Sequence, residues 1–156
     1  MHKMTKALVT AASSAALILG LAGSAGANGN VKWESDTNHL CLAHTPDFWG
    51  HPYEVAMRSC GSNGQAQNGW YEELQSDGTW LFRADNDRSY CLTAYSDHDV
   101  YMEKCSGNDW QRWYENKYDN GWRLGHKATN WFLEDDDNGT GIQVRPWDGA
   151  SDQLWH

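Results

Sequence analysis

The sequence predicts an all-β domain built from three copies of one structural unit. Two observations support this prediction. The tryptophans that close each copy, Trp70, Trp113 and Trp155, are 43 and 42 residues apart, so the chain repeats at a nearly constant period. Short apolar stretches also alternate with turn signals rich in Gly, Asn and Asp, and no helical periodicity joins them. A period of this length without a helical pattern indicates repeats that share one core.

Each copy is predicted to contribute four strands. The first strand contains a tryptophan that precedes the leucine of the second strand by about ten residues. The third strand is an alternating apolar stretch, and the fourth leads out of the closing tryptophan. Three such copies fit a β-trefoil, a closed barrel capped by hairpins, with repeats at about residues 30–77, 78–119 and 120–156. The tryptophans of the first strands are Trp33, Trp80 and Trp122, and the leucines of the second strands are Leu42, Leu92 and Leu133.

Residues 1–27 are predicted to be a secretory signal peptide. Two lysines precede an apolar run rich in Ala, and the small residues Ala25 and Ala27 stand before the expected cleavage point. The run is short and weakly apolar for a bilayer span, which disfavours an uncleaved anchor. We therefore expect a secreted protein with one domain over residues 28–156.

The predicted mature chain is strongly acidic, with 10 basic and 21 acidic residues and a net charge of −11. Such a surface repels phosphate backbones and anionic lipid. The charge therefore argues against nucleic acid and membranes as partners.

The four cysteines, in an exported chain, are expected to form disulfides. Four cysteines allow three pairings, and the repeat favours Cys41 with Cys60 and Cys91 with Cys105, because each pair occupies the same two places in its copy. In the third copy these places hold Phe132 and Trp147, so an aromatic contact is expected there instead. No Cys-x-x-Cys spacing is present, which disfavours zinc.

The sequence contains no pattern typical of catalysis or of a metal site. The six histidines after residue 27 fall in no nucleophile-elbow, zincin or triad signature. The acidic run from Glu134 to Gly139 resembles a calcium loop, but Arg145 stands where the bidentate Glu is required. We therefore expect a protein that is not an enzyme and that uses no cofactor and no metal.

The order Cys-Leu, an alternating apolar stretch, a second Cys and Gln-x-Trp, in three copies, resembles the ricin-type β-trefoil (R-type lectin) family. The resemblance covers about residues 30–156. It implies that each closing tryptophan packs in the shared barrel core and that the glutamine bonds the backbone. In the first copy, Asn68-Gly69-Trp70 stands where the other copies have Gln-x-Trp. The core residues implied by the resemblance are Trp70, Gln111, Trp113, Gln153 and Trp155.

The resemblance also implies where a sugar would bind. In that family a site combines an acidic residue two places after the first cysteine, a polar residue and an aromatic residue on the third strand, and an Asn before Gln-x-Trp. Carboxylates and amides bond sugar hydroxyls, and an aromatic face packs the C–H side of the ring. The first copy, with Ala43, Ala56 and Arg58, is predicted to be silent, and the second is a weak match, with Thr93, Tyr101, Glu103 and Trp110.

The third copy is the best match to a sugar site. It places Glu134 at the acidic position, Gln143 on the third strand and Asp152 where Asn would stand. Arg145 replaces the stacking aromatic, where a guanidinium can lie on a sugar ring, pair with Glu134 or Asp152, or select an acidic sugar. Carbohydrate or a glycoconjugate is therefore the expected partner. A solvated ion pair on an unused surface remains an open alternative.

A protein partner is the second hypothesis. The loop containing Phe48 and Trp49 has the character of an exposed surface loop, and Trp110 and Trp131 also lie in polar settings. A trefoil that presents such aromatics to a protein would act as an inhibitor, a toxin subunit or a receptor-binding module.

Overall fold

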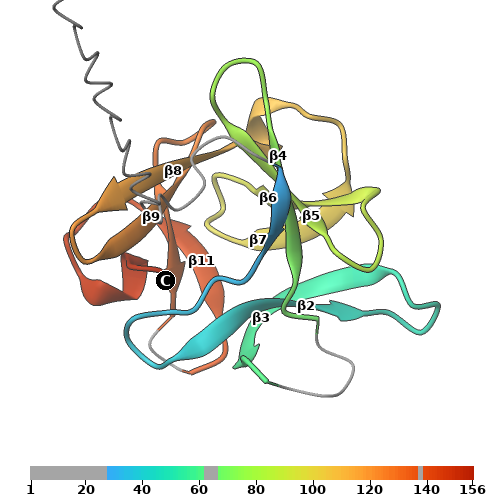
Figure 1. Ribbon diagram of the computed structural model, residues 1–156, viewed down its shortest axis with the longest axis horizontal. Coiled ribbons are helices and arrows are strands. Elements are labelled where there is room, and N and C mark those ends of the chain that lie inside the picture. Colours follow the sequence, from blue (N-terminus) through green and yellow to red (C-terminus); the bar gives the residue numbers. More distant parts are fainter. Residues whose placement is uncertain (1–27, 62–66, 137–138) are drawn as a thin grey trace, which may run out of the picture.

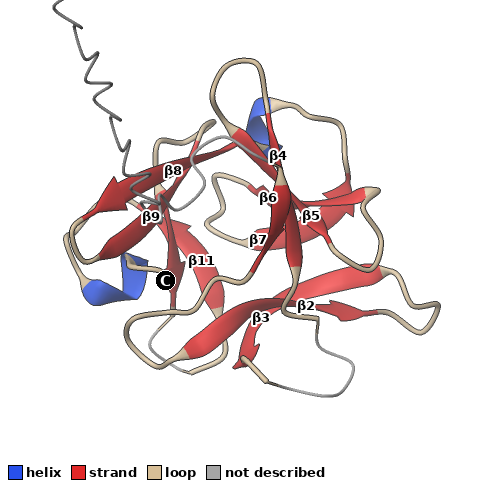
Figure 2. Ribbon diagram, in the orientation of Figure 1, coloured by secondary structure: helices blue, strands red, loops and turns tan. Residues whose placement is uncertain are grey.

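The structure, a computed structural model of the 156-residue chain, describes residues 28–61, 67–136 and 139–156. The predicted signal peptide lies outside the described residues, as does part of the acidic run from Glu134 to Gly139. Figure 2 shows that strands dominate and that the helices are single short turns. The strands are β1 (Gly29–Val31), β2 (Leu40–Pro46), β3 (Pro52–Ser59), β4 (Trp70–Leu74), β5 (Trp80–Ala84), β6 (Tyr90–Ala94), β7 (Val100–Lys104), β8 (Trp113–Tyr118), β9 (Gly121–His126), β10 (Phe132–Asp135) and β11 (Ile142–Arg145), and the 3-10 helices are η1 (Asp109–Gln111) and η2 (Ser151–Gln153).

The strands form a closed barrel in which the two ends of the domain meet. Antiparallel pairs join β1 to β4, β4 to β5, β5 to β8 and β8 to β9. The ring is completed by the C-terminal residues, because Trp155 pairs with Trp122, and Glu34 and His156 exchange backbone hydrogen bonds of 3.0 and 2.9 Å. Closure removes the free sheet edges that would otherwise remain. The third copy therefore supplies isolated bridges at Trp155 where a full fourth strand was predicted.

Three hairpins, one from each copy, cap this barrel. They are β2–β3, β6–β7 and β10–β11, and each pairs the leucine-bearing second strand with the apolar third strand. Figure 1 shows the three copies around a common centre, the first in blue to green, the second in yellow-green to light orange and the third in orange to red. This arrangement is a β-trefoil, the fold class that the threefold sequence repeat predicts.

The core is built from the same side chains in every copy. The closing tryptophans Trp70, Trp113 and Trp155 are fully buried, and the indole Nε1 of each donates to the backbone oxygen of the leucine in its own copy, at 2.9, 3.1 and 3.1 Å. Burying an indole requires a partner for its N–H, and the leucine carbonyl supplies it each time. The acceptor leucines are Leu42, Leu92 and Leu133.

The side-chain amide two residues before each closing tryptophan donates a hydrogen bond to the backbone at the end of the third strand. Gln111 Nε2 donates to the Lys104 oxygen at 3.0 Å, and Gln153 Nε2 donates to the Pro146 oxygen at 2.9 Å. In the first copy Asn68 Nδ2 makes the corresponding bond to the Ser59 oxygen at 2.8 Å. The shorter amide of the irregular first copy thus makes the contact that Gln makes in the other two.

Two disulfides join the hairpins of the first two copies. Cys41 is bonded to Cys60 and Cys91 to Cys105, the pairs that the repeat predicts. Each closed loop contributes about 3 kcal/mol by restricting the unfolded chain. In the third copy the rings of Phe132 and Trp147 meet edge to face with centroids 5.4 Å apart, so an aromatic contact occupies the place of the disulfide.

No helix in residues 28–61, 67–136 or 139–156 has the length and apolar character needed to cross a membrane.

Candidate functional site

The third repeat places three of the predicted site residues on the hairpin β10–β11 and the fourth on the adjacent η2. Glu134 on β10 is the direct cross-strand partner of Gln143 on β11, and Arg145 follows two residues later on the same face of β11. Asp152 enters from η2, which packs against β10. The strand pairing fixes the first three side chains, and the short helix adds the fourth.

The Glu134 carboxylate is held from two sides. Gln143 Nε2 donates to its Oε1 and Gln153 Nε2 donates to its Oε2, both at 2.9 Å. Glu134 as a whole is 7% exposed, and Gln153 also donates to the backbone oxygen of Pro146. An ionised carboxylate has about four acceptor positions, so two fixed amide donors orient it and leave acceptor capacity for a ligand.

This geometry decides which substitution of Glu134 can test binding. A surface Glu134 would be replaceable by Ala with little change in stability. The buried carboxylate instead satisfies two amide groups, and its removal would leave these donors unpaired. We therefore expect Glu134→Ala to destabilise the fold by about 1–3 kcal/mol, so Glu134→Gln is the better probe of binding.

Arg145 extends the same hydrogen-bonded chain to the surface. Its Nε donates to Gln143 Oε1 at 3.0 Å, and the side chain is exposed. To the roles considered from sequence, contact with a carboxylate or with a ligand, the structure adds a third, since Arg145 orients the amide that orients Glu134. The guanidinium retains N–H donors beyond this bond.

A carboxylate cluster lies beside this hydrogen-bonded chain. Carboxylate oxygens of Glu134, Asp148 and Asp152 come within 4.8 Å of one another. Oxygen ligands of this kind suit hard cations such as Ca²⁺. Acidic groups commonly gather in this way without a bound ion, so the cluster does not by itself make a metal centre.

Trp147 is an aromatic side chain close in sequence to this site, two residues after Arg145. It is 49% exposed, and the guanidinium of Arg123 lies 4.0 Å from its ring centroid. Tyr118 and Phe132 also contact the ring. Sequence analysis treated Trp147 only as the replacement for a cysteine. Its partial exposure depends on what packs around it, which the repeat does not specify.

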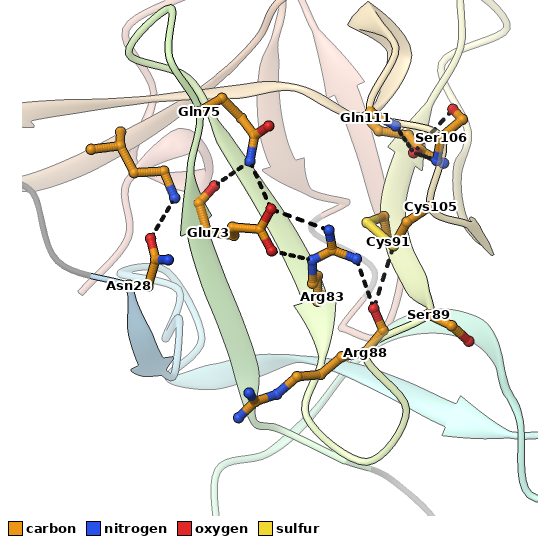
Figure 3. Close-up of polar contacts among 12 residues, drawn as sticks. Asn28, Glu73, Gln75, Arg83, Arg88, Ser89, Cys91, Cys105, Ser106 and Gln111 are labelled. Carbon is orange, nitrogen blue, oxygen red and sulfur yellow. Dashed lines mark hydrogen bonds and ion pairs between the residues drawn. A yellow bond between two sulfur atoms is a disulfide. The ribbon is translucent and has the colours of Figure 1, made fainter.

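The second repeat forms a different surface, made of aromatic rings and carboxylates. The Tyr95 ring lies 5.8 Å from that of Tyr101 and 5.3 Å from that of Trp110, and Tyr95 Oη donates to Glu103 Oε2 at 2.8 Å. Thr93, at the acidic position, accepts a bond from Gln111 Nε2 at 3.1 Å. Figure 3 shows Gln111 beside Ser106 and the second disulfide, with its oxygen accepting the Ser106 N–H at 2.7 Å. Sequence analysis did not identify Tyr95, because this residue follows the second strand of its copy and does not occupy any of the sugar-site positions of the ricin-type family.

The remaining candidate tryptophans differ in exposure. Trp49 is 77% exposed, beside Phe48 at 93%. Trp131 packs on the core, and the His98 ring stacks on it at 4.4 Å with an interplanar angle of 5°. The prediction that Trp131 offers a free face to a ligand is therefore wrong. A histidine from the preceding repeat covers it. In the first copy, Ala43 and Ala56 are buried and offer no polar side chain.

Comparison with known proteins finds similarity to solved structures only. No protein-family model and no curated protein matches the chain. The designed threefold-symmetric protein ThreeFoil is 16% identical with a TM-score of 0.67, over 81% of this chain and 96% of that one. The β-trefoil lectin of the Vibrio vulnificus hemolysin/cytolysin, solved with N-acetyl-D-lactosamine bound, is 23% identical with a TM-score of 0.61, over 83% of this chain and 93% of that one.

A third similar structure is a non-toxic homologue of type II RIPs from Momordica charantia, in complex with α-methyl-D-galactoside. It is 21% identical with a TM-score of 0.63, and the match covers 83% of this chain but only 47% of that one. At these identities the likeness concerns the backbone, because a fold carries many functions. The chain is a β-trefoil whose structural neighbours include sugar-binding trefoils.

Proposed function

We propose that this protein is a secreted, ricin-type carbohydrate-binding module whose site lies in the third repeat. The observation that carries the proposal is the Glu134 carboxylate, which the amides of Gln143 and Gln153 hold in one orientation at the hairpin end. A carboxylate fixed before the ligand arrives loses little conformational freedom on binding. The sugar-bound trefoil structures similar to this chain support the same ligand class.

The site would recognise a sugar through paired hydroxyl groups. Two neighbouring hydroxyls would donate to Glu134, while N–H groups of Arg145 and the Gln143 amide would donate to ring or hydroxyl oxygens. Arg145 is a planar, permanently charged donor, and it favours a ligand carrying a carboxylate over its neutral counterpart. The proposed ligand is therefore a terminal sugar with adjacent hydroxyls, with preference for an acidic sugar.

Replacing Glu134 by Gln tests the site. The substitution keeps the shape of the side chain, removes its charge and turns one acceptor into a donor. We expect retention on the preferred glycan to weaken by about ten- to a hundredfold, as follows from losing one hydrogen bond to a charged group. A glycan array that includes neutral and acidic sugars finds the ligand, and calorimetric titration with that glycan gives the change in Kd.

Glu103→Gln is the matched control, because it removes one carboxylate from the second-repeat place that Arg145 holds in the third. Binding of neutral and acidic sugars should survive this change. If the Glu134→Gln protein binds the glycan as tightly as the parent and melts at the same temperature, the third repeat is not the binding site.

The exposed loop between β2 and β3 favours a second candidate function, binding of a protein partner. Phe48 and Trp49 meet edge to face at 5.2 Å, and almost their whole surface faces solvent. Asp47 Oδ1 accepts the backbone N–H groups of Trp49 and His51, at 2.8 and 2.9 Å, so the loop is organised while its aromatics remain uncovered. Aromatic side chains in this state are typical anchors of protein interfaces.

Trp49→Ala is expected to weaken capture of a protein partner by about 30-fold or more, the effect of losing a 2 kcal/mol anchor. The partner would be isolated from the medium with the parent protein as bait, and its Kd then measured for the parent, Trp49→Ala and Glu134→Gln proteins. A partner that binds all three alike would show that the loop is not the contact.

A further inference from the structure

The turn between β6 and β7 places a histidine where the first repeat has a glycine. His98 has a φ of 79°, and Gly50, in the corresponding turn between β2 and β3, has a φ of 84°. In each turn this residue donates its N–H to the backbone oxygen three places earlier, at 3.2 Å in the second repeat and 3.0 Å in the first. The left-handed conformation suits glycine and costs free energy for a residue with a Cβ atom. The contacts that offset this cost at His98 lie outside its own turn.

His98 contacts the third repeat through its backbone, a ring nitrogen and the face of its ring. The Val144 N–H donates to the backbone oxygen of His98 at 2.9 Å, and His98 Nδ1 lies 3.0 Å from the backbone oxygen of Val144. A carbonyl oxygen only accepts, so Nδ1 carries a proton and donates it. The imidazole also lies flat on the indole of Trp131, with ring centroids 4.4 Å apart and an interplanar angle of 5°. The side chain is therefore fixed by its edge and by its face.

These contacts hold the strand that carries two residues of the candidate sugar site. Val144 is fully buried and stands between Gln143 and Arg145 on β11. Its N–H and its C=O belong to the two peptide units that lie between the Cα atoms of Gln143 and Arg145. His98 therefore bonds both of these peptide units. A β-bridge between Asp99 and Gln143 continues this pairing along the same strand.

The order imposed on β11 reaches the Glu134 carboxylate through side chains. Gln143 Nε2 donates to Glu134 Oε1 at 2.9 Å, and Arg145 Nε donates to Gln143 Oε1 at 3.0 Å. A hydrogen bond weakens steeply when its donor is misaligned, so a shift of the backbone at Gln143 or Arg145 would disturb the donors of the site. A change in the second repeat would therefore affect a ligand bound in the third.

We propose that His98 is a positioning residue for sugar binding in the third repeat. By holding Val144, it fixes the Gln143 amide and the Arg145 guanidinium before a ligand arrives. The ligand class in this proposal rests on the proposed function, whereas the positioning is a property of the free protein. His98 does not touch the sugar, and it acts on affinity by lowering the conformational freedom that the site loses on binding.

Two substitutions test the imidazole. His98→Gly removes the side chain and the strain, and the backbone bond from Val144 can still form, as a glycine occupies this place in the first repeat. His98→Asn tolerates the left-handed conformation and places its Nδ2 where Nδ1 was, so a donor to the Val144 oxygen returns. We expect His98→Gly to weaken binding of the preferred glycan by about three- to tenfold in calorimetric titration, and His98→Asn to recover most of this loss.

A measurement without ligand separates the positioning from the choice of sugar. We expect the NMR order parameter of the Gln143 side-chain amide to fall below about 0.6, the range of mobile groups, in the His98→Gly protein and to recover in the His98→Asn protein. An unchanged order parameter in the His98→Gly protein overturns the proposal, whatever the ligand. An unchanged Kd overturns it as well, provided that Glu134→Gln weakens binding. If Glu134→Gln leaves binding unchanged, the proposed sugar site fails, and the order parameter alone decides the positioning.

His39→Gly is the matched control. His39 is also a histidine in the left-handed conformation, with a φ of 58°, but its ring pairs with Glu34 at 3.0 Å in the first repeat. Its replacement should change neither the order parameter of the Gln143 amide nor the Kd for the glycan. Equal changes in the His39→Gly and His98→Gly proteins would show a general loosening of the fold and would overturn the positioning role of His98.

Discussion

Replacing Trp113 by Ala is expected to lower the free energy of unfolding by about 3–5 kcal/mol, a large part of the stability of a domain this size. The indole is fully buried, lies parallel to Phe82 with ring centroids 6.1 Å apart, and contacts His126 at 4.8 Å. Its Nε1 also donates to the Leu92 oxygen at 3.1 Å. Ala would leave a cavity beside Phe82 and His126 and an unpaired backbone oxygen at Leu92.

Trp113→Phe separates these two contributions. Phe retains most of the ring and loses the indole N–H, so we expect a smaller loss of about 1–3 kcal/mol, from the unpaired carbonyl oxygen of Leu92. Urea unfolding followed by circular dichroism measures both variants. Trp49→Ala is the matched control, since that indole is 77% exposed and its loss should change stability by less than about 0.5 kcal/mol. Similar losses at Trp113 and Trp49 would contradict the core assignment.

Glu72→Gln is expected to stabilise the protein at neutral pH. Glu72 on β4 and Glu115 on β8 approach each other inside the barrel, and Glu72 is 6% exposed. Burial, and then the neighbouring Glu115, raise the pKa of Glu72 above its ordinary value of 4.5, and burial raises the pKa of Glu115 as well. The native state therefore retains a proton that the unfolded chain releases.

The sign of the effect follows from proton linkage. Where the native state binds more protons than the unfolded state, stability falls as pH rises, by about 1.4 kcal/mol per pH unit for one proton. This loss begins above the ordinary carboxyl value of 4.5 and continues through neutrality. Gln carries no such cost, so we expect Glu72→Gln to add about 1–3 kcal/mol at pH 7 and to add little at pH 4.5.

Denaturant unfolding of parent and variant at pH 4.5, 6, 7 and 8 checks this expectation. The relevant quantity is the difference in unfolding free energy between variant and parent at each pH. Burial lowers the pKa of His44 and of His126, so these two groups destabilise the protein as pH falls, whereas Glu72 stabilises it. Glu73→Gln is the control in the next position of the same strand. The hydrogen bond from Arg83 lowers the pKa of Glu73, so replacing Glu73 by Gln should lower the free energy of unfolding by up to about 1 kcal/mol at pH 7. A pH-independent difference for Glu72→Gln would contradict a retained proton.

The strands, the hairpins and the disulfide pairs could be predicted from the sequence because each depends on residues within one repeat. Cys41 lies on β2 and Cys60 directly follows its partner strand β3 in the same hairpin. Leu42 accepts its hydrogen bond from the tryptophan that closes the same copy. Local spacing therefore specifies these contacts. The candidate sugar-site residues of the third repeat could be predicted for the same reason, since Glu134 and Gln143 are cross-strand partners within one hairpin.

Contacts between residues of different repeats could not be predicted from the sequence. His98 of the second repeat covers Trp131 of the third, and Glu72 meets Glu115 across the barrel. Glu54 on β3 and Glu103 on β7 line one pocket although they lie on different hairpins. The spacing of residues along the chain does not indicate such pairs, because the distance between two residues of different hairpins depends on how the hairpins pack.

By itself, then, the sequence determined the threefold β-trefoil, its core tryptophans and its disulfide pairs, because side-chain alternation and turn residues act over a few positions and recur in each copy. Only the tertiary structure decided that Glu134 is buried with its carboxylate held by two amides, and that the ring of Trp131 is covered by His98. The physical reason is that burial and charge balance are set by every neighbour in space, and in a closed barrel most of those neighbours belong to another copy.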